Sequence, residues 1–275
     1  MSKFAHFKYD RCGVGNRLFQ YVHAKLSCQA SGGYKLIQTG IPELNIPSSG
    51  LEEAVSVVCD EDTKSTCIWK PQSILQNHSI YKDFLGEIKT WDCFDTIDET
   101  NEDDLVIHLR AGNRFLSKNA LFSATADVLE NALSKIDFKK LHIVTNLKKN
   151  TQWTIEDIND HMEYLKTNGG DGEPAEVYQK TYPFLPPEIS LKYTNSFIDL
   201  FDKYDVEWIS GSILEDFNYM RKFKKIIVPR STLSWWSAVT GVAENVYVYG
   251  PWAEHKKLTP HHLGNTNYEG WKSWG

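Results

Sequence analysis

The feature that most constrains the fold is a short apolar run that leads directly into a turn and a helix. Residues 226–228 (Ile-Ile-Val) form a continuous apolar segment, which is typical of a buried strand, and Pro229 ends its hydrogen-bonding ladder. The helix-capping residues that follow are Ser231, Thr232 and Ser234. A buried strand that turns directly into a helix predicts a parallel α/β sheet, in which such a turn lies at the ligand-binding carboxyl edge.

The same turn has the chemistry of an anion-binding site. The first N–H groups of a helix lack partners within the helix, and the helix dipole makes this end positive. Taken alone, however, the stretch is better explained as an ordinary strand-to-helix turn, with a Ser or Thr cap and two core tryptophans, Trp235 and Trp236. Its meaning therefore depends on the other turns of the chain.

A second strand, turn and helix pattern lies near the N-terminus. Residues 4–9 are the expected strand, Gly13 and Gly15 permit a tight turn, and Asn16 is the expected N-cap of the next helix. The third glycine of the dinucleotide fingerprint is missing, so NAD is not predicted. A simple strand-to-helix turn explains this motif equally well.

A third pattern lies near the middle of the chain. Residues 105–109 are the expected buried parallel strand, and His108 and Arg110 project on the same side because side chains alternate along a strand. An Arg at a strand end, followed by Gly112, is well placed to hold a phosphate with its planar guanidinium. An Arg in a salt bridge and a core His are an equally good explanation of this motif alone.

Composition limits the remaining possibilities. The 275 residues are 41% hydrophobic, enough for one large or two small cores. The chain has 30 basic and 36 acidic residues, a net charge of −6, which argues against a general nucleic-acid binder. We expect no membrane span and no signal peptide, and hence a cytoplasmic protein. The five cysteines form no CxxC pair, which indicates free thiols.

An acidic, unpatterned stretch at residues 96–104 indicates a boundary between two α/β domains, residues 1–103 and 104–275. Further strands are expected at 34–38, 54–59, 141–145, 206–209 and 245–249, and helices at 72–88, 125–136, 154–165, 197–204 and 213–220. Residues 146–187 are the least regular part and are interpreted as an insertion near the mouth of a site. The acidic triplet 60–62 is interpreted as a solvated loop, and no metal site is predicted.

Taken in order, the motifs resemble a known family. Residues 13–21 resemble the GxGNQLFQY opening of the family 11 fucosyltransferases. Residues 108–113 resemble the HxRxGD phosphate-binding motif shared by the α1,2-, α1,6- and protein O-fucosyltransferases, and residues 216–238 resemble their DFxxM…IIxxSTFSWWxA block. The order and spacing of these motifs also agree with the family.

The resemblance implies a GT-B fold, in which two Rossmann-like domains face each other across a cleft. Residues 1–103 would be the acceptor-side domain and residues 104–275 the nucleotide-sugar-binding domain. The implied reaction is an inverting, metal-independent transfer of a sugar, usually fucose from GDP-fucose, to a hydroxyl of a glycan. The implied partners are thus a nucleotide sugar and a glycan acceptor, with no separate cofactor. Golgi fucosyltransferases usually have a membrane anchor, so a chain without a predicted anchor looks more like a soluble cytoplasmic enzyme of a bacterial or viral type, in the latter case in the host cytoplasm.

The resemblance also implies roles for individual residues. Arg110 would be catalytic, because its charge offsets the charge that develops on the departing diphosphate. The donor-binding residues would be Gly13, Gly15, Asn16, His108, Arg110, Gly112, Asp216, Ser231, Thr232, Leu233 and Ser234. Asp10, beside the first glycine turn, is the candidate catalytic base, with Asp95 as the second candidate.

The chain departs from the family pattern at Arg17, Ala111, Asn113 and Leu233. The donor therefore stays open, and a UDP-pentose such as UDP-xylose is the alternative to GDP-fucose. A non-catalytic nucleotide-sugar-binding protein on the same scaffold is a second alternative. A dinucleotide-dependent oxidoreductase is disfavoured by the incomplete glycine motif.

Overall fold

The computed structural model describes residues 3–7, 13–30, 34–49, 67–69, 82–94, 96–111, 115–116, 125–148, 150–170, 174–181, 183–228, 231–249 and 271–274. The chain divides into two compact units, Met1–Phe94 and Asp95–Gly275. The domain boundary predicted from the sequence, between residues 103 and 104, falls inside strand β4 (Asn101–Leu109) of the second unit.

The first unit contains a small parallel sheet in the order β2-β1-β3. Its elements are β1 (Lys3–Phe7), α1 (Val14–Ala30), β2 (Tyr34–Gln38), η1 (Pro42–Leu44), β3 (Cys67–Trp69), η3 (Lys82–Phe84) and α3 (Leu85–Ile88). Helix α1 connects β1 to β2, as a parallel pair requires. Its side chains Leu18, Phe19 and Val22 are fully buried, so this helix supplies much of the core of the unit.

The second unit contains a larger sheet of six parallel strands. Its elements are β4 (Asn101–Leu109), α5 (Ala126–Leu133), β5 (Leu141–Thr145), α6 (Ile155–Asn168), α7 (Ala175–Thr181), α8 (Pro187–Phe201), β6 (Val206–Ile209), α9 (Ile213–Arg221), β7 (Phe223–Val228), α10 (Thr232–Thr240), β8 (Asn245–Tyr249) and β9 (Trp271–Trp274).

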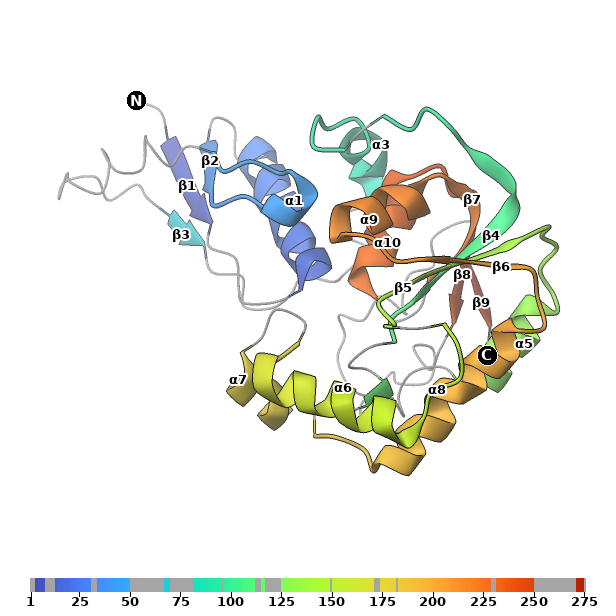
Figure 1. Ribbon diagram of the computed structural model, residues 1–275. Coiled ribbons are helices and arrows are strands. Elements are labelled where there is room, and N and C mark those ends of the chain that lie inside the picture. Colours follow the sequence, from blue (N-terminus) through green and yellow to red (C-terminus); the bar gives the residue numbers. More distant parts are fainter. Residues whose placement is uncertain are drawn as a thin grey trace. The chain divides into compact units, whose positions relative to one another are not determined.

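The strand order of this sheet is β6-β5-β4-β7-β8-β9. Numbered along the chain within the unit, this is 3-2-1-4-5-6, the order of the doubly wound nucleotide-binding sheet. Helices α9 and α10 lie on one face, and α5 and α8 lie on the other (Figure 1). The second unit is therefore a parallel α/β sheet compatible with a Rossmann-like fold.

Side-chain alternation along β4 assigns its residues to the two faces of the sheet. Leu105, Ile107 and Leu109 belong to the core cluster that includes side chains of α5 and α8. Val106 and His108 consequently point to the opposite face, which α9 and α10 cover. On that face Trp235 and Trp236 of α10 are fully buried, which holds the start of α10 against the sheet.

Local sequence signals explain where several helices begin. Thr154 caps α6 in a reciprocal pair with Asp157, and Ser212 caps α9 in the same way with Glu215. Helix α8 starts at Pro187, ten positions earlier than the start predicted at residue 197. The prediction took the prolines as a sign of irregular chain, but proline suits the first turn of a helix because the N–H it lacks has no intrahelical partner there.

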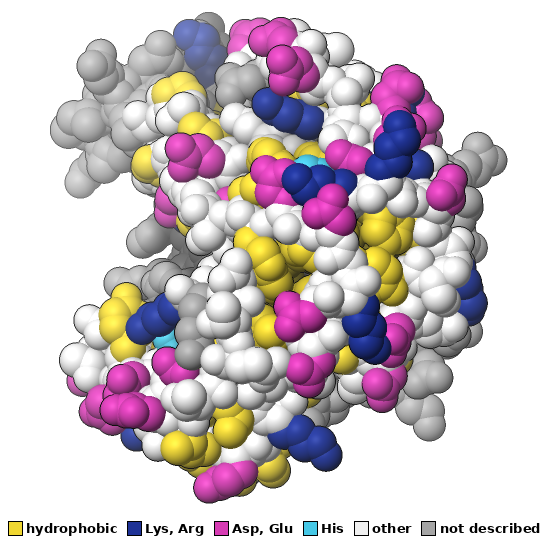
Figure 2. Space-filling model, turned by 45° about the vertical axis from the view of Figure 1, so that its right-hand side comes forward, with side chains coloured by type: hydrophobic (Ala, Val, Ile, Leu, Met, Phe, Trp, Pro, Cys, Tyr) yellow, Lys and Arg dark blue, Asp and Glu magenta, His cyan; other side chains and the backbone are white. Residues whose placement is uncertain are grey.

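Two predicted elements of the first unit lie wholly or partly outside the described residues. These are the strand at 54–59 and the first ten residues of the helix at 72–88. Within the described part, residues 82–84 form a 3-10 turn and only Leu85–Ile88 are α-helical. On the face of the molecule in Figure 2, acidic and basic side chains are interspersed, as expected for a chain with a net charge of −6.

Candidate functional site

The topological switch point of the large sheet lies between β4 and β7. The chain leaves β4 toward β5 on one side, whereas it continues from β7 to β8 on the other. Ligands of open α/β sheets bind outside the carboxyl ends of the strands at such a point. The parallel register pairs Val106 with Ile226 and Ile107 with Ile227, so the residues that follow both strands emerge side by side.

His108 and Arg110 lie at the carboxyl end of β4, as predicted. The Nδ1 atom of His108 is buried and has no hydrogen-bond partner within the described part of the chain. Burial, and secondarily the nearby charge of Arg110, lower the pKa of His108 to about 3. His108 is therefore a neutral imidazole beside a permanent cation, and its buried ring nitrogen is able to accept or donate a hydrogen bond to a ligand.

Ser231 occupies the N-cap position of α10, at the end of β7. Its side chain makes no capping hydrogen bond, contrary to the capping role predicted for it, while its carbonyl accepts from the N–H of Trp235 and from Ser234 Oγ. The first-turn N–H groups of a helix have no intrahelical partners, and the dipole makes this end positive. Thr232 and Leu233 in this turn are partly exposed. The start of α10 and Arg110 thus follow neighbouring strands at one edge of the sheet, and each has the chemistry to hold an anion.

Thr145, at the end of β5, fixes the position of the neighbouring strand end. Its Oγ1 donates a 2.8 Å hydrogen bond to the carbonyl oxygen of Leu109 and accepts one of 3.2 Å from the N–H of Leu147. Since Leu109 directly precedes Arg110, this buried hydroxyl stabilises the backbone from which the guanidinium extends. The sequence prediction treated Thr145 only as the last residue of a strand.

Asp216 lies in the first turn of α9, which follows the edge strand β6. Its Oδ1 accepts a 2.9 Å hydrogen bond from the N–H of Gly211, and burial raises the pKa of its carboxyl group. Strand β5 separates β6 from β4 in the sheet. Asp216 therefore lies at the same edge of the sheet as Arg110, but beside β6 and not beside β4. Its Oδ1 already accepts the hydrogen bond from Gly211.

The glycine turn of the first unit differs from its prediction in one respect. Helix α1 begins at Val14, and the carbonyl of Gly13 accepts from the N–H groups of Asn16 and Arg17. Gly15 and Asn16 are thus first-turn residues of α1, and Asn16 is not the N-cap. The prediction placed Val14 in the turn, because the apolar pattern used to locate the helix starts only at Leu18. Arg17 forms an ion pair with Glu43, a contact within the first unit.

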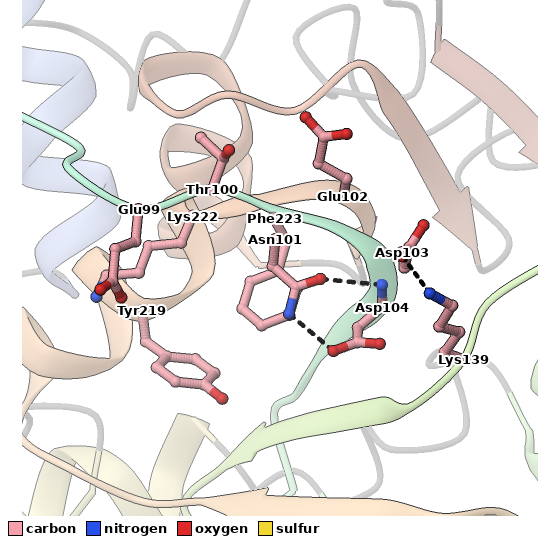
Figure 3. A pocket seen from close by; sticks show the side chains of 10 residues that line it. All are labelled: Glu99, Thr100, Asn101, Glu102, Asp103, Asp104, Lys139, Tyr219, Lys222 and Phe223. Atoms are coloured by element: carbon pink, nitrogen blue, oxygen red, sulfur yellow. Dashed lines mark hydrogen bonds and ion pairs between the residues drawn. The ribbon is translucent and has the colours of Figure 1, made fainter.

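A pocket of about 630 Å³ lies at the opposite edge of the large sheet (Figure 3). We call it the amino-edge pocket, and its lining residues are Glu99, Thr100, Asn101, Glu102, Asp103, Asp104, Lys139, Tyr219, Lys222 and Phe223. They come from the amino ends of β4, β5 and β7 and from the last turn of α9. The candidate site at the switch point and this pocket are therefore at different edges.

A buried histidine links two residues of the amino-edge pocket. His142 Nε2 lies 3.1 Å from Asp104 Oδ2, and His142 Nδ1 lies 2.8 Å from the Tyr219 hydroxyl oxygen. The sequence prediction missed this cluster. The available signal was a polar residue inside the apolar strand 141–145, because a buried polar side chain needs a partner.

The comparisons returned no match. This holds for a scan against protein-family models, for a search of curated proteins and for a search of solved structures.

Several predicted site residues lie outside the described residues. These are Asp10, Asp95 and Gly112. The acidic triplet 60–62, predicted to be a solvated loop, also lies outside the described residues. Of the predicted set, His108 and Arg110 lie at the carboxyl end of β4, and Ser231, Thr232, Leu233 and Ser234 follow the neighbouring strand β7. Asp216 lies at the same edge of the sheet. Among the described helices, none is long and apolar enough to cross a membrane.

Proposed function

We propose that this protein is an inverting glycosyltransferase that moves a sugar, most simply fucose from GDP-fucose, onto a hydroxyl of a glycan. A transferase with another donor, such as UDP-xylose, is the first alternative. A non-catalytic nucleotide-sugar-binding protein on the same scaffold is the second. All three share a nucleoside diphosphate as the group that the switch point holds.

The observation that carries this proposal is that Arg110 and the start of α10 follow the paired strands β4 and β7 at the switch point. The two motifs are about 120 residues apart in the sequence. They belong to neighbouring strands, which lie about 4.8 Å apart in a sheet. A guanidinium, a helix N-terminus and an imidazole nitrogen that has no partner among the described residues, all at one edge of the sheet, are suited to a diphosphate.

The first turn of this sheet argues against a dinucleotide. The strand order alone would suit NAD, because dinucleotide-binding sheets share it. The residues after β4, however, are Arg110, Ala111, Gly112 and Asn113, which lack the glycine fingerprint that lets the backbone approach a pyrophosphate. A side-chain cation replaces that fingerprint here, which favours a nucleotide sugar.

In the proposed reaction the acceptor oxygen attacks the anomeric carbon of the donor sugar as the bond from that carbon to the β-phosphate oxygen breaks. The acceptor proton passes to a base, for which Asp10 is the candidate. The electron pair of the broken bond stays on the diphosphate, where Arg110 and the N–H groups of α10 offset the developing charge. The chemistry needs no metal, and we propose a GT-B arrangement in which the first unit carries the acceptor, in a cytoplasmic enzyme.

Nucleotide binding is tested first, by thermal shift with GDP, UDP and NAD. A ligand that binds only the folded state stabilises it by about 2.7 kcal/mol at one hundred times its dissociation constant. We expect a shift with GDP or UDP, and the larger shift identifies the base of the donor. A shift with NAD and with neither nucleoside diphosphate would exclude the transferase.

Catalysis is tested by donor hydrolysis and transfer assays with GDP-fucose and UDP-xylose. Replacing Arg110 with Ala is expected to lower turnover by at least roughly 10²-fold, the size of effect seen when one transition-state donor is removed. Lys166→Ala, which removes a positive charge from the exposed surface of α6, is the matched control and should keep full activity. Full activity in Arg110→Ala would show that Arg110 is not catalytic, and binding without turnover would favour the non-catalytic alternative.

A further inference from the structure

The amino-edge pocket is separate from the switch point. Strands β4, β5 and β7 are parallel, so the pocket and Arg110 lie at opposite edges of the same sheet. The six residue steps from Asp104 to Arg110 correspond to roughly 20 Å of extended chain. A ligand of the pocket is therefore additional to any nucleotide at the switch point.

The floor of the pocket is fixed by the chain of hydrogen bonds from Asp104 to Tyr219. An ionised carboxylate can only accept, so His142 Nε2–H donates to Asp104 Oδ2. His142 Nδ1 lies 2.8 Å from the Tyr219 hydroxyl oxygen and 3.6 Å from Glu207 Oε2, so the same ring also fixes the position of Tyr219.

Asn101 is held in the same way. Its Nδ2 donates to Asp104 Oδ2 over 2.8 Å, and its Oδ1 accepts from the N–H of Asp104 over 3.0 Å. Figure 3 shows both bonds. The carboxylates of Glu102 and Asp103 also line the pocket. The fixed groups of the lining are thus mainly acceptors, and a fitting ligand must donate several hydrogen bonds.

Two classes of ligand carry many hydrogen-bond donors, namely amines and saccharides. The positive charges in the lining favour a saccharide. Asp103 pairs with Lys139, and Glu102 pairs with Lys224 over 2.8 Å, so these carboxylates are already compensated. Lys222 adds a further cation to the lining. With Lys224, the four carboxylates of the lining face three ammonium groups, so little net negative charge is left to hold a polyamine. Sugar hydroxyls can donate to the carboxylates and accept from the ammonium groups.

The size and the apolar part of the pocket also suit a saccharide. A volume of about 630 Å³ lies within the range of small-molecule sites. The rings of Tyr219 and Phe223, with centroids 5.3 Å apart, add apolar surface beside the acceptors. A sugar ring presents both an apolar C–H face and a rim of hydroxyls, and so matches both features.

We propose that the amino-edge pocket binds a neutral saccharide unit, with Asp104 and Asn101 accepting its hydroxyl hydrogen bonds and with Tyr219 and Phe223 beside its apolar face. This site is independent of the function proposed above, because it would hold a sugar whether or not the switch point binds a nucleotide.

The test uses saturation-transfer NMR on the full chain with methyl glycosides of glucose, galactose and fucose, with lactose, and with spermine as the competing class. Thr100→Trp places a large ring at an exposed position of the lining, and Glu99→Trp does so at a second one. Thr167→Trp, on the exposed surface of α6, is the matched control. We expect at least one saccharide to bind, with an affinity that is weaker by about tenfold or more in both pocket variants. The affinity should be unchanged in Thr167→Trp, and saturating GDP should not change it.

Three results would overturn the proposal. The first is that none of these saccharides gives a signal. The second is a saccharide signal that both pocket variants leave intact. The third is a spermine signal that the pocket variants abolish while no saccharide binds there. Each result would leave GDP binding at the switch point unaffected, so the two proposals can fail separately.

Discussion

The hydroxyl of Thr145 donates a 2.8 Å hydrogen bond to the carbonyl oxygen of Leu109 and so ties the end of β5 to the end of β4. Both residues are buried, and the next residue along β4 is Arg110. The position of the proposed catalytic cation therefore depends on a neighbouring strand, and not only on its own turn.

Thr145→Val is expected to weaken this tie while preserving the shape of the side chain. The Leu109 carbonyl and the Leu147 N–H would each lose a partner, and an unsatisfied buried group destabilises by about 1–3 kcal/mol. GDP affinity should fall as well, because Arg110 is less well positioned. Denaturant unfolding and GDP titration measure the two effects, and Thr145→Ser, which keeps the hydroxyl, should restore GDP binding. Unchanged GDP affinity in Thr145→Val would contradict the positioning role.

His108→Leu is expected to stabilise the protein and to weaken ligand binding at the same time. The buried Nδ1 has no partner among the described residues, so replacing the ring with an apolar side chain removes an unsatisfied group and should raise stability by about 1 kcal/mol. If a ligand normally satisfies this nitrogen, GDP affinity should fall about tenfold. Thermal unfolding with and without GDP separates the effects. A variant that gains stability and binds GDP normally would place His108 outside the site.

Gly241→Ala is expected to lower the stability of the protein by disturbing the contact between the ends of α10 and α9. A Cβ at residue 241 would lie 2.5 Å from the carbonyl oxygen of Arg221 and 2.6 Å from that of Ser237, so backbone must move. Overpacking of this kind costs about 1–3 kcal/mol. Gly86→Ala is the matched control, because no heavy atom lies within 4 Å of its Cβ position and alanine favours a helix. Denaturant unfolding should therefore show a loss for residue 241 and no loss for residue 86.

The strands of the large sheet were largely predictable from the sequence. The strands predicted at 141–145, 206–209 and 245–249 have the same bounds in the structure. Buried parallel strands are short apolar runs, and turn residues mark their ends. The prediction for β4 began at Leu105 and missed residues 101–104, because they are polar and acidic. Their pairing and side-chain contacts are long-range, and no local pattern shows them.

Each of the two motifs of the candidate site was predicted from the sequence. Local patterns could not predict, however, that the strands before them are neighbours in the sheet. His108 and Arg110 follow one apolar run and Ser231 follows another, and either could have been an ordinary turn. Only the strand order, which places β4 beside β7, brings them together. The amino-edge pocket was missed for the same reason, since Asp104, His142 and Tyr219 come from three elements far apart in the chain.

The stability of the protein should fall as the solution is acidified from about pH 6.5 to pH 4, and His161 should be one cause. This side chain is 7% exposed, neither ring nitrogen has a hydrogen-bond partner among the described residues, and it lies against Trp153 and Tyr164. Burial, and secondarily the charge of Lys148, lower its pKa in the folded protein to about 4.

The sign of the effect follows from proton binding. The unfolded chain protonates His161 near its ordinary pKa of about 6.5, whereas the folded protein resists protonation until about pH 4. Between these values the unfolded state binds the extra proton, so the folded state loses relative stability as the pH falls, by at most about 3 kcal/mol. Above pH 6.5 neither state is protonated at this residue, and the effect vanishes.

His161→Phe keeps an aromatic ring between Trp153 and Tyr164 and removes the titrating group. The variant should be at least as stable as the parent at pH 7.5 and should lose less stability between pH 6.5 and 4.5. Denaturant unfolding at a series of pH values measures this difference. Asp104 and Glu207, whose pKa values are lowered by their partners, also lose stabilisation toward acid pH, and this part should be identical in both proteins. Parallel curves for parent and variant across this range would show that His161 does not resist protonation in the folded state.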